Sequence, residues 1–429
     1  MRVEPATMLV GDLAVPAVKG ICQRGVLLGA IAEGTTELRG FGHAADTDAA
    51  IRAVRALGVD VSEPAEDVVR IEGRGLRGLR APAEPIDCEN AGTVLRLLSG
   101  ILAGQEGRFD LVGDASLSSR PVRVEEPLTR MGAQFETTEG RLPATIVGAP
   151  LHAIRYPLPM ASAQVKSSVL LAGLLAQDGP TIVEEPTPTR DHTERLLTSI
   201  GVPVRRRGSQ ISVTPVERLS AFELDISGDF SSAAPFVVAA TLLAGSELRV
   251  HGVNVNPTRI GLLSVLERMG ANIAILNRRQ VGGEPVGDLD IRSAELVATT
   301  IEAPEVPLLV DELPLFALLA TYARGDSVVS GASELRAKET DRIETVVDGL
   351  RALGAHIRAT DDGFVVRGVP ARLRGGVIDA HGDHRIAILG GVAGLLSREG
   401  VEIRGADVVA VSFPGFFDLL DSLRGATTS

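Results

Sequence analysis

The sequence predicts a two-domain α/β protein made of six repeated units of about 70 residues, three in each domain. The first observation behind this prediction is a recurring turn, in which a helix-like stretch ends at a glycine and alternating, strand-like residues follow. The turn glycines lie 73, 72, 66, 80 and 75 residues apart, a spacing too regular for unrelated turns. They are Gly34, Gly107, Gly179, Gly245, Gly325 and Gly400.

A second glycine marker keeps the same period. Each of these glycines follows a helical pattern and precedes a strand-like one, as a glycine just past a helix end does. The set is Gly58, Gly132, Gly201, Gly270 and Gly354. A chain of 429 residues is long for one hydrophobic core, so we expect two domains and therefore a three-plus-three arrangement of repeats.

Composition excludes several classes of protein. Hydrophobic residues make up 45% of the chain, which is typical of a globular protein. The 11 Phe, 2 Tyr and absence of Trp argue against an aromatic platform for single-stranded nucleic acid. The net charge of -12 argues against a general polyanion-binding surface, although a local arginine-lined site would still attract small anions. We therefore expect small-molecule partners and no nucleic acid.

The N-terminal segment lacks the basic-then-apolar order of a signal peptide, and the apolar runs are short or interrupted. We expect a soluble, cytoplasmic protein without membrane contact. Cys22 and Cys88 stand alone, with no Cys or His at metal-ligand spacing, so we interpret both as small buried residues. No metal and no cofactor is expected, and we expect a monomer.

In the second half of the chain, charged residues stand directly before apolar helices. Lys338, Glu339 and Arg342 precede one such helix, and Arg385 in "HGDHRIAILGGVAGL" opens another. Asp311 lies with Glu312 at the start of a third. Free backbone N-H groups at a helix start can bind an anion, and acids there suit the helix dipole.

The first half shows a similar design with small residues. Asn90 and Gly92 precede a helix, and Arg120 stands directly before Pro121, which can open a helix. Arg190 lies in "PTPTRDHTERLL", ahead of another helix. Helix starts carrying cations and exposed backbone indicate a site for phosphorylated or carboxylated small molecules, with Asp311 and Glu339 available to move protons.

The chain resembles the enolpyruvyl transferase family over nearly its whole length, and in particular the branch that acts on shikimate 3-phosphate. Eight motifs carry the resemblance, all in the family's order and spacing. They read "SAQVKS", "RDHTE", "NAGT", "SGDFSSAA", "NPTRIGLL", "DELP", "KETDRI" and "HGDHRIA".

The resemblance implies an inverted αβ barrel in each of two domains, with the chain crossing between them twice. Residues 1-18 plus 228-429 would form a discontinuous domain carrying much of the phosphoenolpyruvate and acid/base site. Residues 19-227 would form the domain that binds shikimate 3-phosphate. The implied reaction joins the enolpyruvyl carbon of phosphoenolpyruvate to the 5-hydroxyl of shikimate 3-phosphate and expels phosphate, without a metal or a covalent enzyme intermediate.

The resemblance also implies site residues. Asp311, Glu339 and Lys19 would be catalytic, with Asp311 at the hydroxyl proton and the other two at the methylene carbon. Shikimate 3-phosphate would contact Lys19, Gly20, Arg24, Ser162, Ala163, Gln164, Arg190, Asp311 and Lys338. Phosphoenolpyruvate would contact Lys19, Asn90, Gly92, Arg120, Gln164, Arg342 and Arg385.

The three lysines of the chain, against 40 arginines, fit this assignment. Lys19 and Lys338 match the family's substrate lysines, where a compact, rotatable ammonium differs from a planar guanidinium. Lys166 lies in the shikimate-binding motif and would assist there.

The chain departs from the family pattern at two positions that bear on function. Gly20 replaces a serine whose hydroxyl binds the shikimate phosphate, and Glu89 replaces a common glycine before Asn90. These departures leave open a non-catalytic or altered-specificity paralogue that binds small phosphorylated ligands. A transferase acting on UDP-N-acetylglucosamine is a further alternative, but the loop before Arg120 lacks the cysteine on which that enzyme relies.

Overall fold

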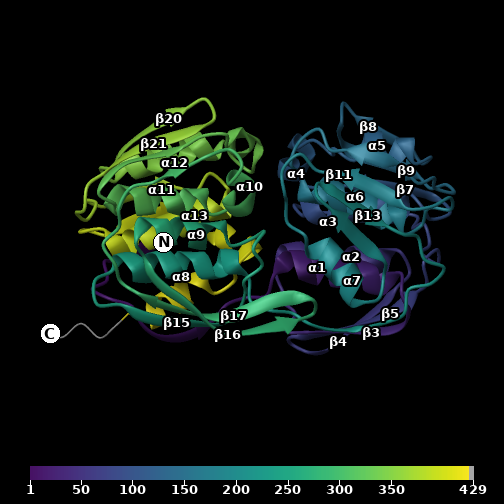
Figure 1. The fold of residues 1–429 in the computed structure, drawn as a ribbon, viewed down its shortest axis with the longest axis horizontal. Coiled ribbons are helices and arrows are strands. Elements are labelled where there is room, and N and C mark those ends of the chain that lie inside the picture. The colour runs from purple at the N-terminus through teal and green to yellow at the C-terminus, as the bar shows by residue number, and fades with distance from the viewer. Residues whose placement is uncertain (425–429) are drawn as a thin grey trace. The chain divides into compact units, whose positions relative to one another are not determined.

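The computed structural model describes residues 1-424 as a mixed α/β protein of two compact units. Among these residues, unit 1 comprises residues 1-16, 228-279 and 285-424, and unit 2 comprises residues 17-227 and 280-284. Within the described residues there are six β-sheets, and each unit contains most of the strands of three of them (Figure 1). This arrangement confirms the predicted six-repeat α/β organisation.

Five sheets share one four-stranded plan. Two parallel strands lie side by side, the second pairs antiparallel with the last strand of the repeat, and that strand forms a hairpin with the third. In three of these sheets a helical segment connects the two parallel strands directly, whereas in the other two sheets those strands come from distant parts of the chain. A further helical segment leads into each hairpin. Parallel strands need such crossover connections, so each 70-residue unit carries its own helices.

Unit 2 contains three of these four-stranded sheets. The sheets run β14 (Glu223–Asp225), β3 (Glu33–Arg39), β5 (Val68–Arg74), β4 (Asp60–Ala65); then β6 (Ile86–Asp87), β7 (Arg108–Val112), β9 (Arg141–Val147), β8 (Gln134–Thr138); then β10 (Arg155–Pro157), β11 (Thr181–Glu184), β13 (Gln210–Val213), β12 (Val204–Arg207). The helices are α1 (Lys19–Ala30), α2 (Ala45–Ala56), α3 (Gly92–Leu102), α4 (Ala115–Ser119), α5 (Glu125–Arg130), α6 (Ala163–Gly173) and α7 (His192–Ser199).

Unit 1 repeats the plan with segments from both ends of the chain. Its sheets run β2 (Val10–Ala14), β15 (Glu247–Asn254), β17 (Glu284–Arg292), β16 (Asn272–Val281); then β18 (Thr300–Ile301), β19 (Gly325–Val329), β21 (Gly363–Gly368), β20 (His356–Thr360); then β22 (Gly376–Asp379), β23 (Val401–Arg404), β1 (Arg2–Val3). Its helices are α8 (Phe230–Leu242), α9 (Gly261–Met269), α10 (Val306–Leu309), α11 (Leu313–Tyr322), α12 (Arg342–Ala352), α13 (His384–Leu396) and α14 (Phe416–Ser422), with 3-10 turns η1 (Ser333–Ala337) and η2 (Ala406–Val411).

Both glycine markers fall where the sequence pattern places them. The six turn glycines stand at or just before the second parallel strand of each sheet, and all have positive φ, from 79° at Gly400 to 129° at Gly107 and Gly179. The five helix-end glycines precede the third strand of each four-stranded sheet, and they also have positive φ. A residue with a side chain would be strained at such a φ, which explains why glycines mark the repeat in the sequence.

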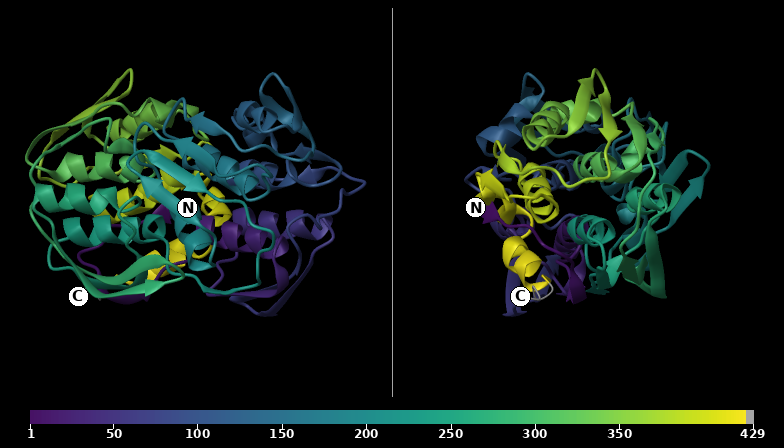
Figure 2. Two further views of the ribbon diagram at one scale, coloured as in Figure 1. Left: turned by 45° about the vertical axis from the view of Figure 1, so that its right-hand side comes forward. Right: turned by 90° about the vertical axis from the view of Figure 1, so that its left-hand side faces the viewer.

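The sixth sheet lacks its own hairpin and is completed by the N-terminal strand β1. Arg2 and Val3 pair antiparallel with Glu402 and Val401 of β23. Figure 2 shows this purple segment lying against the yellow C-terminal strands. The sequence shows no sixth helix-end glycine, which agrees with a repeat that ends after its second parallel strand.

Three helices form the centre of each unit and are buried on nearly all sides. In unit 1 they are α8, α11 and α13, which pack against one another in the hydrophobic core. In unit 2 they are α1, α3 and α6. Helices that are apolar all round need burial on every face, and the three sheets of each unit supply it. Each central helix precedes the second strand of its sheet, so its N-terminus lies at the end of the repeat where the chemistry-bearing motifs stand.

Both cysteines are fully buried, as expected for small core residues. Burial raises the pKa of the Cys88 thiol to about 12, helped by Asp87 and Glu89. Within residues 1-424, no helix is long and apolar enough to cross a membrane.

The pairing of β1 is testable in the folded chain. Val3 is buried, so Val3→Ala removes two methyl groups from the core and should lower the free energy of unfolding by about 2 kcal/mol. Val377, on β22 of the same sheet, is 37% exposed, so Val377→Ala should change it by less than about 0.5 kcal/mol. Denaturant unfolding of both variants measures the difference. Equal losses would contradict a sheet completed by β1.

Candidate active site

Acidic residues begin the helices of unit 1 that carry the predicted motifs. Asp229 accepts a hydrogen bond from the backbone N-H of Ser231 (2.8 Å) at the start of α8. Asp383 accepts one from Arg385 N (2.9 Å) at α13. Asp341 caps α12, and Glu312 occupies the cap position of α11. The three aspartates satisfy otherwise unpaired N-H groups, and all four carboxylates suit the positive end of each helix dipole.

Arg342 links two of these helix starts. Its Nε and Nη2 donate to the two oxygens of Asp383 at 2.8 and 3.2 Å, and Nη2 also donates to Glu339 at 2.5 Å. The side chains of Arg342 and Asp383 are 2% and 0% exposed. Burial lowers the pKa of Arg342, but Glu339, Asp383 and Asp311 outweigh it, so the net pKa lies above the ordinary value. Arg342 therefore stays charged and fixes the position of Glu339.

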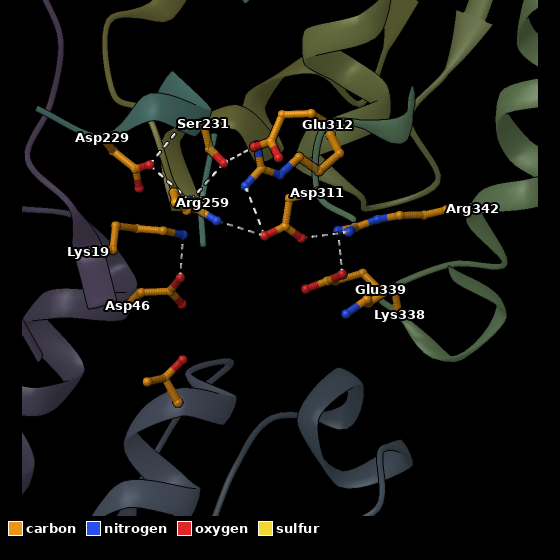
Figure 3. A network of polar contacts seen from close by, with 12 residues as sticks. Lys19, Asp46, Asp229, Ser231, Arg259, Asp311, Glu312, Lys338, Glu339 and Arg342 are labelled. Carbon is orange, nitrogen blue, oxygen red and sulfur yellow. Dashed lines mark hydrogen bonds and ion pairs between the residues drawn. The ribbon is translucent and has the colours of Figure 1, made fainter. Parts of the chain in front are cut away.

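Asp311 lies among three guanidinium groups. Its carboxylate is 3.3 Å from Arg259 Nη1 and 3.6 Å from Arg342 Nη1 (Figure 3). It is also 3.9 Å from Arg385 Nη2. The side chain is 17% exposed, so it is enclosed but reachable. A carboxylate held by several cations is an ionised base with a fixed direction.

Arg259 is the residue at this site that the sequence motifs did not single out, although it lies in "NPTRIGLL". It is buried, and Nη2 donates to Asp229 Oδ1 at 2.9 Å and to Ser231 Oγ at 2.7 Å. Ser231 in turn donates to the fully buried Glu312 (Figure 3). Burial lowers the pKa of Arg259, but Asp229, Glu312 and Asp311 outweigh it and raise the pKa above its ordinary value. Arg259 thus joins α8 and α11 behind Asp311.

The other two predicted cations of unit 1, Lys338 and Arg385, differ in how many polar contacts their side chains make within the protein. Lys338 forms an ion pair with Glu334 (2.6 Å). In contrast, the Arg385 side chain forms no hydrogen bond within residues 1-424, and its one ion pair there is the 3.9 Å contact with Asp311. Arg385 is thus a nearly buried guanidinium with donors to spare for a ligand.

In unit 2, α1 begins at Lys19, whose ammonium is 2.7 Å from Asp46 Oδ2 (Figure 3). Gln23, one turn later, donates to the Asp46 carbonyl at 2.9 Å, so α1 holds Asp46 by both its side chain and its backbone. No sequence motif selects Asp46, because it lies 27 residues from Lys19.

Arg24 and Gly20 meet on the same helix. Arg24 Nη1 donates to the Gly20 carbonyl (2.7 Å), Nε to Thr193 Oγ1 (2.7 Å) and Nη2 to Ser167 Oγ (3.0 Å). A Cβ at Gly20 would lie 3.1 Å from Arg24 Nη1. Burial lowers the pKa of Arg24 to about 10, although Glu194 and Glu284 favour the charged form. Arg24 remains a cation at neutral pH and ties α1 to α6 and α7.

A second group in unit 2 joins α3 to α6 through Arg96. Arg96 Nη1 donates to Gln164 Oε1 (2.6 Å) and to the Gly92 carbonyl (3.2 Å). Gln164 donates to Thr93 Oγ1 (3.0 Å). A Cβ at Gly92 would lie 2.9 Å from Arg96 Nη1, so the absence of a side chain permits this approach. The site residues predicted from the sequence do not include Arg96.

Asn90 and Arg120 belong to the same group. Arg120 Nη2 donates to Asn90 Oδ1 at 2.6 Å, and Asn90 Nδ2 donates to Asp114 at 2.7 Å. The expectation that Pro121 opens a helix is wrong: Arg120 ends α4, and α5 begins only at Glu125. The carbonyls of Pro121 and Val122 instead accept hydrogen bonds from Arg96, which holds this segment out of a helix.

Residues 162-166 form the start of α6. Ser162 is its N-cap, with Oγ 3.4 Å from Val165 N, and Ala163 is its first residue. Lys166 is fully buried, 3.0 Å from Glu185 and 2.7 Å from Glu194. Glu185 also accepts from Thr189 (2.8 Å), so this buried lysine secures the segment that leads to Arg190. Arg190 itself is half-buried, directly before α7.

Glu89 adopts a left-handed backbone with φ 50°, which explains why glycine suits this position. Its carboxylate forms an ion pair with Arg52 at 2.5 Å. The negative charge that the sequence adds before Asn90 is therefore held by an arginine.

Each unit by itself brings together part of the predicted set. In unit 1, Asp311, Glu339, Arg342 and Arg385 form one network, and Lys338 is adjacent to it in sequence but paired with Glu334. In unit 2, Lys19, Gly20 and Arg24 share the start of α1, and Gln164 joins Gly92 through Arg96, with Asn90 and Arg120 alongside. Among residues 1-424, no group of three or more His, Cys, Asp and Glu side chains is arranged to hold a metal ion.

Comparison with known proteins points to one family. A family model described as EPSP synthase (3-phosphoshikimate 1-carboxyvinyltransferase) matches residues 3-420. The chain is 49% identical over 415 residues to the 3-phosphoshikimate 1-carboxyvinyltransferase of Acidithiobacillus ferrooxidans, covering 96% of this chain and 95% of that protein. It is 47% identical to the protein of the same name from Desulforudis audaxviator, covering 99% of each.

Solved structures agree with the sequence relatives. The EPSP synthase of Acinetobacter baumannii superposes with a TM-score of 0.89 at 41% identity, covering 99% of this chain and 98% of that one. An enolpyruvyl transferase of Streptomyces tendae superposes with a TM-score of 0.78 at 17% identity, covering 98% and 96%, which shows a shared fold.

The buried Asp229 makes stability depend on pH in a defined direction. Burial acts to raise the pKa of Asp229, but Arg259 outweighs it and the net pKa is lowered. The stabilisation is thus complete above the ordinary Asp pKa of about 4 and is lost as pH falls through the lowered value. Asp229→Asn should therefore cost about 3 kcal/mol at pH 7, and the gap from the unsubstituted protein should narrow below about pH 4.

Denaturant unfolding between pH 7 and pH 3 measures this gap. Asp225, whose side chain is 65% exposed, provides the matched control, and Asp225→Asn should stay within about 0.5 kcal/mol at every pH. A loss at Asp229→Asn that is the same at both ends of the range would refute the assignment.

Proposed function

Because the chain belongs to the EPSP synthase family, the 3-phosphoshikimate 1-carboxyvinyltransferases, we propose that it transfers the enolpyruvyl group of phosphoenolpyruvate to the 5-hydroxyl of shikimate 3-phosphate. Family membership confirms the predicted transferase class and the enolpyruvyl transferase fold. The matched family is the shikimate 3-phosphate branch, not the UDP-N-acetylglucosamine branch. A monomeric state and a cytoplasmic location stay predictions.

The observation that carries the proposal is Asp311 among Arg259, Arg342 and Arg385. Transfer begins when the 5-hydroxyl oxygen forms a bond to C2 of phosphoenolpyruvate. Asp311 accepts the hydroxyl proton, because a carboxylate kept ionised by cations and held in one direction is a suitable base. The same step adds a proton to the C3 methylene, which gives a tetrahedral intermediate.

We assign the methylene proton to Lys19 and Glu339. The Lys19 ammonium carries a proton to give, and the Glu339 carboxylate, fixed by Arg342, can take one back. In the second step the bond from C2 to the phosphate oxygen breaks, phosphate departs with its bonding electrons, and a proton leaves the methyl group. Lys19 has then lost one proton and Glu339 has gained one, so exchange with solvent restores both groups. The hydroxyl proton held by Asp311 leaves with the phosphate.

The departing phosphate requires cations that the protein has not already neutralised. Arg342 donates hydrogen bonds to Asp383 and Glu339, whereas the N-H donors of Arg385 are available to a ligand. We therefore assign Arg385 the main phosphoenolpyruvate contact in unit 1, with Arg342 contributing charge and geometry. In unit 2, Asn90, Gly92, Arg120 and Gln164 form a second set of phosphoenolpyruvate groups.

Shikimate 3-phosphate is assigned chiefly to unit 2. Ser162, Ala163 and Gln164 present the free N-terminus of α6, where backbone N-H groups favour an anion. Arg24 and Arg190 add charge near the same helix starts, and Lys19, Asp311 and Lys338 complete the proposed contacts. Since Gly20 offers no hydroxyl, binding of the phosphate depends on these cations and on the backbone.

The proposal is tested by incubating the purified protein with both substrates and following phosphate release together with the enolpyruvyl product by mass spectrometry. The unsubstituted protein should release one phosphate per product formed. Asp311→Asn and Glu339→Gln should each lower kcat by about 100- to 10,000-fold, because each removes a proton acceptor.

Asp361→Asn and Glu399→Gln serve as matched controls, since both acids are exposed on unit 1. They should leave kcat unchanged. Folded protein that forms no product would reject the reaction, while product formed at full rate by Asp311→Asn would reject only the role of that residue.

A further inference from the structure

A pocket of about 200 Å³ lies in unit 1 at the C-terminal ends of α11, α12 and α13. These three helices pack against one another (Figure 1). Their N-terminal ends carry Glu312, Arg342 and Arg385. With about 1.5 Å of rise per residue, the 11 residues of α12 put its two ends about 16 Å apart. The pocket is therefore distinct from the candidate active site.

Four arginines line this pocket: Arg367 on β21, Arg372 and Arg374 on the segment between β21 and β22, and Arg398 after α13. His356 adds a fifth basic side chain, and no Asp or Glu is among the lining residues. Asp326 lies opposite Arg367 in the β19 and β21 pair, yet the two form no ion pair within the described chain. A concentration of unopposed positive charge is unexpected in a chain of net charge -12.

Among the described residues, only one of these four guanidinium groups donates hydrogen bonds to the protein itself. Arg372 donates to the carbonyls of Ala6 (2.8 Å) and Ser397 (3.4 Å). Across residues 1-424, the side chains of Arg367, Arg374 and Arg398 have neither a hydrogen bond nor an ion pair with another residue. Three forked groups with unused N-H donors therefore face one pocket.

Helix C-termini attract cations, so the arginines could serve only to balance the helix dipoles. Three helix ends carry about half a negative elementary charge each, or about 1.5 in total, against four positive charges. Only Arg372 contacts a carbonyl at these ends. An excess of positive charge remains, and it is directed into the pocket.

We propose that this pocket is a binding site for a small, multiply charged oxyanion such as a phosphate or pyrophosphate group. At about 30 Å³ for each water, the volume holds about seven waters, which is enough for one such group. Arginine forks match phosphate oxygens in pairs, which favours a phosphate-type ligand over a chloride ion. Two of the lining residues, Leu373 and Thr321, are buried.

Calorimetric titration with inorganic pyrophosphate, at constant ionic strength in sodium chloride, tests the proposal. Arg374→Gln with Arg398→Gln in one chain should weaken binding at this site at least tenfold. Arg205→Gln with Arg207→Gln removes the same charge from exposed, unpaired arginines on β12 and should change binding less than twofold. Arg385→Gln separates the two anion sites, and binding at the pocket should survive it.

Binding lost in Arg385→Gln but kept in Arg374→Gln with Arg398→Gln would overturn the proposal, because the only anion site would then be the active site. Equal binding in the pocket variant and the β12 control would overturn it as well. All substituted residues of the pocket are exposed, so folding should persist, and circular dichroism checks it. If the double variant unfolds, Arg367→Gln alone gives the same test, with an expected loss of at least threefold.

Discussion

The pairing of Arg342 with Asp383 is the interaction on which unit 1 depends most. It joins the start of α12 to the start of α13 through two hydrogen bonds between side chains that are almost completely buried. A buried charge is tolerated only when its partner and its remaining donors are satisfied. Asp383 meets that condition by capping α13, and Glu339 meets it by taking the other donor of Arg342. The position of a proposed catalytic carboxylate is thus a consequence of how two helices are held.

The same constraint shapes the rest of the site. Helix starts leave unpaired N-H groups, acids satisfy them, and buried arginines then neutralise the acids. Arg259 does so for Asp229, and Arg24 and Arg96 link helix starts in unit 2 through hydroxyl, amide and backbone oxygens. Arg385 stands outside this pattern of full pairing. A residue whose hydrogen-bonding capacity is left unused is better placed to hold a ligand than one fully engaged by the protein.

Much of the fold could be predicted because glycines mark the same turns in every repeat. Each repeat needs a left-handed turn before its central strand, and glycine adopts it without strain, so the period of six units is readable from glycines such as Gly107 and Gly325. The completion of the sixth sheet by β1 was not readable, because two residues at the N-terminus pair with a strand about 400 residues away. Short strands carry too little pattern to reveal such a partner.

The candidate site shows the same division. Residues at helix starts, such as Asp311 and Arg385, could be predicted from the change between polar and apolar sequence. Partners such as Arg259 and Asp46 could not, since their contacts lie 27 to 52 residues away and follow from packing. The prediction of a helix start at Pro121 was wrong. Proline is compatible with a helix start, but the carbonyls of Pro121 and Val122 accept hydrogen bonds from Arg96.

A double-mutant cycle on Arg342→Gln and Asp383→Asn tests the central claim most directly. Each single change should lower the free energy of unfolding by about 3 kcal/mol or more, because it leaves a buried charge without its partner. The double variant should lose less than the sum, by at least about 1.5 kcal/mol, because both charges are then gone. Additive losses would contradict an account in which this pair holds the helix starts of unit 1 together.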